Sequence, residues 1–426
     1  MRTAVIVSPY FPPSSLAGVH RARHLAKHLP AAGWTPLVLC VDEAHYEQRL
    51  DRELAALVPP TVEIRKVGAL SVRWTRLAGI GDIGLRAFPY LRRALVEVLS
   101  RRPVGVVLFT GAPYYPMLLA SLVGKRFGVP VVLDFQDPWV SSWAAAQPVV
   151  SKAGLSHKLA AVLEPIALRN ADFVTSVSDV QNAEMVRRHP SLNAKRMAGI
   201  PIGGDPEDFA ALRRNAADGM STDLEPGFIH LSYVGTYWPA ARPTVTALFR
   251  ALRRLRDEMP DLARRIRLNF FGTSSSAADN VRSIAVAEGV AESIREISNR
   301  LPYLRALAVV AQSDGLLLPG SDEPHFTASK IYTALMSGRP YLSLYHRASS
   351  AHAILSAAGG GRALAFSSRD ELPSLEPAIA EGLKTLALAP QSLGRADPAA
   401  YAPYEARAIA RRFAGIFDSL AEARRA

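Results

Sequence analysis

Short apolar runs rich in β-branched residues alternate with helix-like amphipathic segments along the whole chain. The strands expected in the first half are 3–8, 35–41, 104–109, 130–135 and 172–177. Strands that are apolar throughout are buried on both faces, which requires a parallel sheet covered by helices. The pattern predicts an α/β fold with a doubly wound domain over residues 1–205.

The alternation stops once and then restarts. Residues 206–227 are polar and contain Gly and Pro, which is typical of a linker. A new apolar run at 230–235 and an amphipathic helix at 244–259 then open a second series of the same kind. We therefore expect a second doubly wound α/β domain over 228–403, followed by an amphipathic helix over 404–426. Two such domains facing each other would form a cleft for a small molecule.

Composition excludes several other classes of protein. With 49% hydrophobic and 21% charged residues, the 426-residue chain is neither collagen-like, coiled-coil nor disordered. Its single cysteine, Cys40, excludes a disulfide framework and a cysteine-rich zinc site, and we expect it to be a buried strand residue. The apolar start is too short for a signal peptide, and prolines divide the longest uncharged run, 103–124, into a strand and a helix. We expect a cytoplasmic protein.

The net charge of +12 is concentrated in the first half of the chain. Residues 1–205 hold 24 basic and 15 acidic residues, and the stretch 65–102 alone holds nine basic and two acidic ones. Aromatic and aliphatic residues interleave with the basic ones there, which suits an anionic membrane surface, although a solvated helix face would show the same pattern. Nucleic acid is a disfavoured partner because no recognition motif is present.

Two loops after strands of the first domain carry candidate residues. Gly18 opens a helix after the Pro-rich loop, and Arg21 in its first turn could meet a phosphate or simply be an exposed arginine. Asp137, next to Trp139, follows the strand at 130–135 and could orient or deprotonate a hydroxyl, or cap the following turn.

Two loops of the second domain point to phosphate binding. Gly235 and Thr236 follow a strand, and Arg242 stands near the start of the next helix. Ser329 and Lys330 lie at another helix start, where hydroxyl, amide and ammonium groups can meet a phosphate, although Ser329 could be a plain N-cap and Lys330 a solvated lysine. No His or Cys cluster and no D-x-D triplet predicts a metal site.

The chain resembles the GT-B glycosyltransferases, close to the family 4 type. The resemblance rests on YFPPSSLAGVHRARHLAKHLPAAGW, PVVLDFQDPW, NADFVTSVS, YVGT and SKIYTALMSGRPYL, which occur in that order over nearly the full length. It implies two Rossmann-like domains facing across a cleft, with the acceptor on the first and a nucleotide-sugar donor on the second. It also implies that the final helix crosses back to the first domain.

The resemblance assigns roles residue by residue. Gly18 would face the donor's sugar and phosphate, and Gly235 with Thr236 would form the first turn of the donor domain. Lys330 with Ser329 would steady the diphosphate. Arg242 would share that work. No cofactor and no metal is expected.

One motif departs from the family pattern. A family 4 enzyme usually has two glutamates eight residues apart, the second holding the donor ribose, and here those positions are His325 and Thr333. Thr333 therefore stands at the position that would contact the ribose, and that contact is left open. Whether the reaction retains the configuration of the anomeric carbon is also left open.

The expected function is transfer of a sugar from a nucleotide-diphosphate donor to a hydroxyl acceptor. Surface polysaccharide or glycolipid synthesis on the inner face of a membrane would fit the basic stretch. The alternatives are a nucleotide-sugar epimerase on the same fold and a non-catalytic nucleotide-sugar-binding protein. The sequence leaves the sugar, the base, the acceptor and the oligomeric state undetermined.

Overall fold

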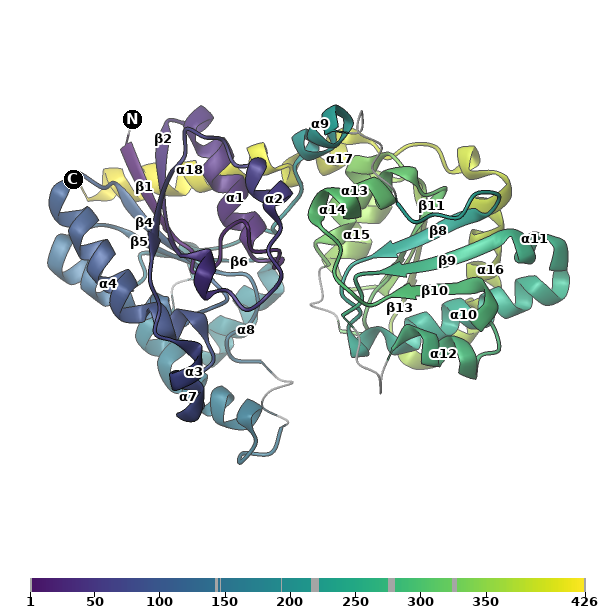
Figure 1. The fold of residues 1–426 in the computed structure, drawn as a ribbon, viewed down its shortest axis with the longest axis horizontal. Helices are drawn as coiled ribbons and strands as arrows, with labels where there is room; N and C mark the ends of the chain where they lie inside the picture. The colour runs from purple at the N-terminus through teal and green to yellow at the C-terminus, as the bar shows by residue number, and fades with distance from the viewer. Residues whose placement is uncertain are drawn as a thin grey trace. The chain divides into compact units, whose positions relative to one another are not determined.

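The chain folds into two units. The computed structural model describes residues 2–141, 145, 147–192, 194–215, 222–274, 280–323 and 328–424. The first unit comprises residues 1–202 and 406–426, and the second comprises 203–405 (Figure 1). None of the described helices combines the length and apolar character needed to cross a bilayer.

The first unit is built on a parallel sheet with the strand order β3-β2-β1-β4-β5-β6-β7. Its strands are β1 (Arg2–Val7), β2 (Trp34–Val41), β3 (Glu63–Val67), β4 (Val106–Gly111), β5 (Val131–Phe135), β6 (Phe173–Ser176) and β7 (Met197–Gly199). The central strands are buried on both faces, because Val5 and Val7 of β1 point into one apolar cluster while Ala4 and Ile6 point into another. Cys40 is buried in β2, as predicted.

Helices cover both faces of this sheet. They are α1 (Val19–His28), α2 (Arg52–Ala56), α3 (Val72–Leu77), α4 (Ile83–Arg101), α5 (Ala120–Leu122), α7 (Lys152–Leu168), α8 (Asp179–Arg188) and α18 (Ala406–Ala423). Helix α18 lies against α1, and its Phe413 and Phe417 are fully buried in their shared cluster (Figure 1). The predicted return of the C-terminal helix to the first unit is therefore confirmed.

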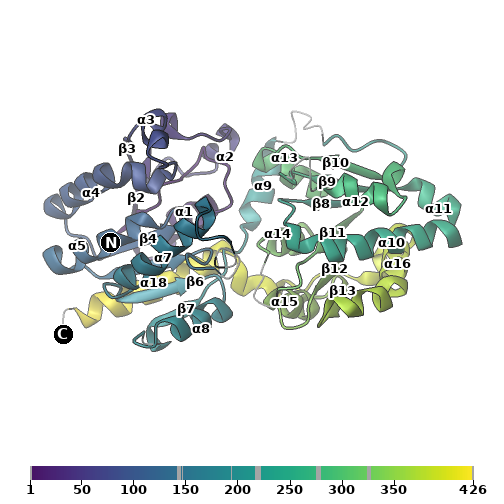
Figure 2. The ribbon, with the colours of Figure 1, turned by 90° about the horizontal axis from the view of Figure 1, so that it is seen from below.

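The second unit repeats the design with the strand order β10-β9-β8-β11-β12-β13, again parallel. Its strands are β8 (Ile229–Val234), β9 (Ile266–Phe271), β10 (Ile294–Ile297), β11 (Gly315–Pro319), β12 (Tyr341–His346) and β13 (Gly361–Phe366). Its helices are α9 (Pro206–Asn215), α10 (Arg242–Glu258), α11 (Pro260–Arg265), α12 (Val281–Ala287), α13 (Tyr303–Gln312), α14 (Lys330–Ser337), α15 (Ser350–Ala358), α16 (Leu372–Leu388) and α17 (Pro398–Tyr401). Figure 2 shows α10 and α16 running side by side.

The predicted linker at 206–227 is wrong for its first part. Residues Pro206–Asn215 form α9, and this helix belongs to the second unit, which begins at Gly203. Phe209, Ala211 and Leu212 are buried, and Asp208 accepts a hydrogen bond from the Tyr303 hydroxyl at 2.8 Å. The segment's polar composition concealed a short amphipathic helix whose apolar face packs on the second unit.

Candidate functional site

In the second sheet the strand order reverses between β8 and β11: β9 and β10 are added on one side of β8, and β11 to β13 on the other. The two strands are therefore neighbours although they are not consecutive in the chain. At such a point the loops that follow the two strands diverge and leave a crevice for a ligand. Gly235 directly follows β8, and Lys330 begins α14 after the loop that follows β11. Two of the predicted site segments therefore leave neighbouring strands at the same edge.

Gly235 lies beside the Lys330 side chain. Gly235 has a φ of +143°, and a Cβ placed there would lie 3.2 Å from the Lys330 Nζ. Any other residue would be strained by the φ and crowded by the ammonium group. The turn therefore needs glycine.

Tyr233 holds Lys330 in place. The lysine ammonium donates a hydrogen bond to the Tyr233 hydroxyl and lies 3.9 Å from the centre of its ring. The same hydroxyl donates to the carbonyl oxygen of Thr236 at 2.6 Å. Tyr233 thus ties the first residue of α14 to the turn after β8. Tyr233 was not predicted from the sequence, where its one local signal is an aromatic side chain two positions before Gly235.

Lys330 lacks an acidic partner among the residues that the structure describes. Burial lowers the pKa of its ammonium from 10.5 to about 7. A buried cation without a counter-charge favours an anionic ligand, because the ligand supplies the missing charge. The arrangement is chemically suited to a phosphate group.

The other residues predicted on α14 lie around Lys330. Ser329 precedes the helix, and its hydroxyl makes no capping hydrogen bond, so the plain N-cap reading is not supported. Thr333 is partly buried one turn after Lys330, on the same side of the helix. His325, the other position of the altered motif, lies outside the described residues.

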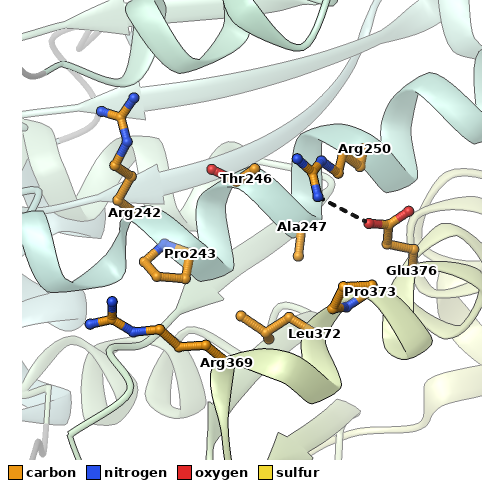
Figure 3. A pocket seen from close by; sticks show the side chains of 9 residues that line it. All are labelled: Arg242, Pro243, Thr246, Ala247, Arg250, Arg369, Leu372, Pro373 and Glu376. Carbon is orange, nitrogen blue, oxygen red and sulfur yellow. Dashed lines mark ion pairs between the residues drawn. The ribbon is translucent and has the colours of Figure 1, made fainter.

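Arg242 lines a cavity of about 290 Å³ between α10 and α16 (Figure 3). Arg250 and Arg369 line the same cavity, and both have acidic partners: Arg250 pairs with Glu288 at 3.2 Å and Glu376 at 3.9 Å, and Arg369 pairs with Asp322. Arg242 is exposed at the first position of α10. Its assignment to a diphosphate stays a prediction.

In the first unit the structure corrects the role of Arg21. Its side chain is fully buried, donates to Asp134 at 3.1 Å and to the Pro201 carbonyl at 2.9 Å, and also bonds the Ile200 carbonyl. The guanidinium lies 5.1 Å from the Phe413 ring centre. Arg21 therefore joins α1 to the sheet and to α18, and it has no free face for a donor phosphate.

Gly18 directly precedes α1, in the loop after β1, where the strand order of the first sheet reverses between β1 and β4. A Cβ there would lie 3.3 Å from the Gln136 Oε1. That oxygen is buried and without a hydrogen-bond partner among the described residues. Gly18 thus leaves room beside an unsatisfied acceptor, and Gln136 is a candidate site residue that the sequence analysis did not name.

Asp137 follows β5 at the edge of an aromatic group. The Tyr114 hydroxyl donates to its carbonyl oxygen at 2.7 Å, and the Tyr114 and Trp139 rings stack at 5.3 Å. Neighbouring protein groups displace water from the carboxyl and raise its pKa above the usual value, although the residue keeps an exposed surface. A carboxylate with a raised pKa can accept a proton from a hydroxyl.

A family model described as a glycosyl transferase 4-like domain matches residues 17–203. The match covers the segment of the first unit that contains Gly18, Arg21 and Asp137. No curated protein sequence matches the chain.

Solved structures match the chain over nearly its full length. HepE from Anabaena, in a complex with UDP-glucose, has a TM-score of 0.59 at 12% identity and covers 98% of this chain and 100% of its own. WaaG, a glycosyltransferase involved in lipopolysaccharide biosynthesis, has a TM-score of 0.60 at 14% identity, with 97% and 99% covered. UDP-GlcNAc 2-epimerase from Methanocaldococcus jannaschii has a TM-score of 0.54 at 10% identity, with 98% and 100% covered.

The two doubly wound sheets and these likenesses together show the predicted fold. Residues 17–203 match the model of the glycosyl transferase 4-like domain, and the chain has the GT-B fold that HepE and WaaG share.

Proposed function

We propose that the protein transfers a sugar from a nucleotide-diphosphate donor to a hydroxyl acceptor. The observation that carries this proposal is the contact of Lys330 with the Gly235 turn at the direction change of the second sheet. HepE, a protein of similar fold, binds UDP-glucose, which supports a donor of this kind.

The chemistry follows from where charge develops. The bond between the anomeric carbon and the diphosphate oxygen breaks, and the leaving nucleoside diphosphate takes the electron pair. Lys330 and the backbone amides near Gly235 and Ser329 would stabilise that charge without a metal ion. Arg242 would add a further cation. Thr333 would stand where a related enzyme contacts the ribose.

Asp137 is the proposed general base. Its carboxylate would take the proton of the acceptor hydroxyl as the new glycosidic bond forms. Trp139, which stacks on Tyr114 and is partly exposed, would offer its indole to a sugar ring. The acceptor would therefore bind to the first unit, at Asp137, and the donor to the second unit, at Lys330.

Donor binding and transfer are tested separately. A panel of nucleotide-sugars is screened by thermal shift, since a ligand of the native state raises the melting temperature by mass action. The ligand that raises it most is then supplied, radiolabelled and with EDTA, to membrane extracts and soluble sugars. If the radiolabelled sugar appears in a product larger than the donor in the presence of EDTA, the protein transfers the sugar without a metal ion. If the donor binds but no labelled product forms, the protein is a nucleotide-sugar-binding protein.

An epimerase is the second candidate, because the Methanocaldococcus jannaschii enzyme has the same fold. An epimerase changes its nucleotide-sugar without an acceptor. Incubation with the donor alone, followed by chromatography of the sugar, therefore separates the two activities.

We also propose a peripheral association with an anionic membrane through residues 65–102, as glycolipid or surface polysaccharide synthesis requires. Several cations of this stretch are paired: Arg76 bonds Glu47 at 2.7 Å and Arg102 bonds Glu63 at 2.7 Å. Arg73, Arg92 and Arg93 are exposed. Replacing Arg73, Arg76, Arg92 and Arg93 by Glu should abolish vesicle binding, and unchanged binding would refute this part.

A further inference from the structure

Helix α7 exposes four large apolar side chains to solvent. Leu155, Leu159, Val162 and Ile166 are 66%, 42%, 61% and 43% exposed. Their spacing of four, three and four places them along one side of the helix. We call this set the α7 stripe. The opposite side of the helix is buried through Gly154, Ala160, Ala167 and Leu168.

The exposed charges of α7 are all positive. Lys152 and Lys158 are exposed beside the α7 stripe, while the helix's acid, Glu164, is fully buried. Glu164 accepts hydrogen bonds from Arg188 at 3.0 Å and His189 at 2.9 Å. The outer surface of α7 therefore combines apolar and cationic side chains with no exposed acid.

Helix α3 presents the same combination elsewhere on the first unit. Trp74 and Leu77 are 76% and 81% exposed, and Arg73 lies between them and the start of the helix. Both helices lie toward the lower end of this unit in Figure 1, but Figure 2 shows them well apart, so they are separate surfaces. Arg92 and Arg93 of α4 are exposed and form no ion pair among the described residues.

We propose that the α7 stripe inserts into the interface of an anionic bilayer, with Lys152 and Lys158 at the level of the lipid phosphates. Large apolar side chains bordered by lysines are the features that place a helix in such an interface. The proposal deepens the proposed membrane association and rests on it, and it adds an insertion surface outside residues 65–102.

The charge pattern favours a bilayer over a second copy of this chain. A symmetric dimer contact would place the same patch on both partners. Two copies of the same cationic patch would then meet, with no exposed acid on α7 to balance Lys152 and Lys158. An anionic bilayer supplies the opposite charge.

Flotation of the full chain with vesicles tests the proposal. The vesicles contain phosphatidylcholine with or without phosphatidylglycerol. Leu155→Ser with Val162→Ser should lower binding to the anionic vesicles at least about tenfold. Lys152→Gln with Lys158→Gln should lower it about 25-fold, at roughly fivefold per cation. The matched control is Val286→Ser with Leu388→Ser, which removes apolar side chains that are 63% and 51% exposed on the second unit and should bind like the wild type.

Four results would overturn the proposal. If the α7 variants float like the wild type while the Arg73/Arg76/Arg92/Arg93 variant does not, the membrane contact stands and the role of α7 is wrong. If the wild type binds no vesicles, both membrane proposals fail. If the control loses binding as well, the effect is not specific to α7. If light scattering shows a dimer that Leu155→Ser with Val162→Ser dissociates, the stripe covers a second copy instead. The melting-temperature shift with UDP-glucose reports donor binding independently in every variant.

Discussion

Raising the pH from 6.5 to 8.5 removes the charge from Lys330 in the free protein, because its pKa lies at about 7. A bound diphosphate supplies the missing negative charge and returns the lysine toward its ordinary pKa of about 10.5. Above pH 7 the protein must therefore take up a proton when it binds the donor. Donor affinity should fall as the pH rises.

The magnitude follows from the two pKa values. With about 7 in the free protein and roughly 10.5 in the complex, the uptake rises from about half a proton per ligand at pH 7 to nearly one above about pH 8. The dissociation constant for UDP-glucose should then rise about 25-fold between pH 6.5 and 8.5. Below pH 6.5 the curve should flatten, because the lysine is already charged before binding.

Isothermal titration calorimetry at five pH values measures this dependence, and buffers of different ionisation enthalpy report the proton uptake. Lys330→Met should bind weakly with no pH dependence in the window. Lys330→Arg keeps its charge at every pH tested, so its affinity should also be flat.

A flat affinity in the wild type would refute the assignment of Lys330 to the diphosphate. The same slope in Lys330→Met would show that another group carries the pH dependence. Holding the upper limit at pH 8.5 keeps the uracil base neutral, so the protein is the source of any slope.

Three further predictions test individual side chains. Tyr233→Phe keeps the ring but removes the hydroxyl that Lys330 bonds, and it should weaken UDP-glucose binding about tenfold or more at pH 7.5, checked by calorimetry. Arg21→Met leaves Asp134 buried without its cation and should cost about 3–5 kcal/mol of unfolding free energy in a urea titration, while a chain that stays folded keeps its affinity for UDP-glucose. Asp137→Asn should lower the transfer rate about 10²–10⁴-fold with donor affinity unchanged; a rate equal to the wild type would remove Asp137 from the mechanism.

Local patterns in the sequence were enough to predict the architecture. Strands that are apolar on both faces, such as β4 and β5, need helices on both sides, so the alternation of runs implied two covered parallel sheets. The residues that end strands or open helices, such as Gly235 and Lys330, were found for the same reason, since a strand end is visible in the sequence. The α9 helix was missed because its short apolar face is diluted by charge.

Partners far apart in the chain depended on the tertiary structure. Arg21 reads locally as a cation in the first turn of a helix, but the sheet order brings it to Asp134, 113 residues away, and the return of α18 places Phe413 over it. Tyr233 and Lys330 are 97 residues apart, and they meet because β8 and β11 are neighbours.

The sequence alone therefore determined the repeating strands and helices, since hydrophobic periodicity records which faces are buried. It did not determine which polar side chains would be buried together, because that depends on strand order and on the direction in which each loop leaves the sheet. The fold pairs Arg21 with the Asp134 carboxylate, which makes Arg21 a structural residue. It leaves Lys330 beside the Tyr233 hydroxyl, with no carboxylate among the described residues, which makes Lys330 a candidate site residue.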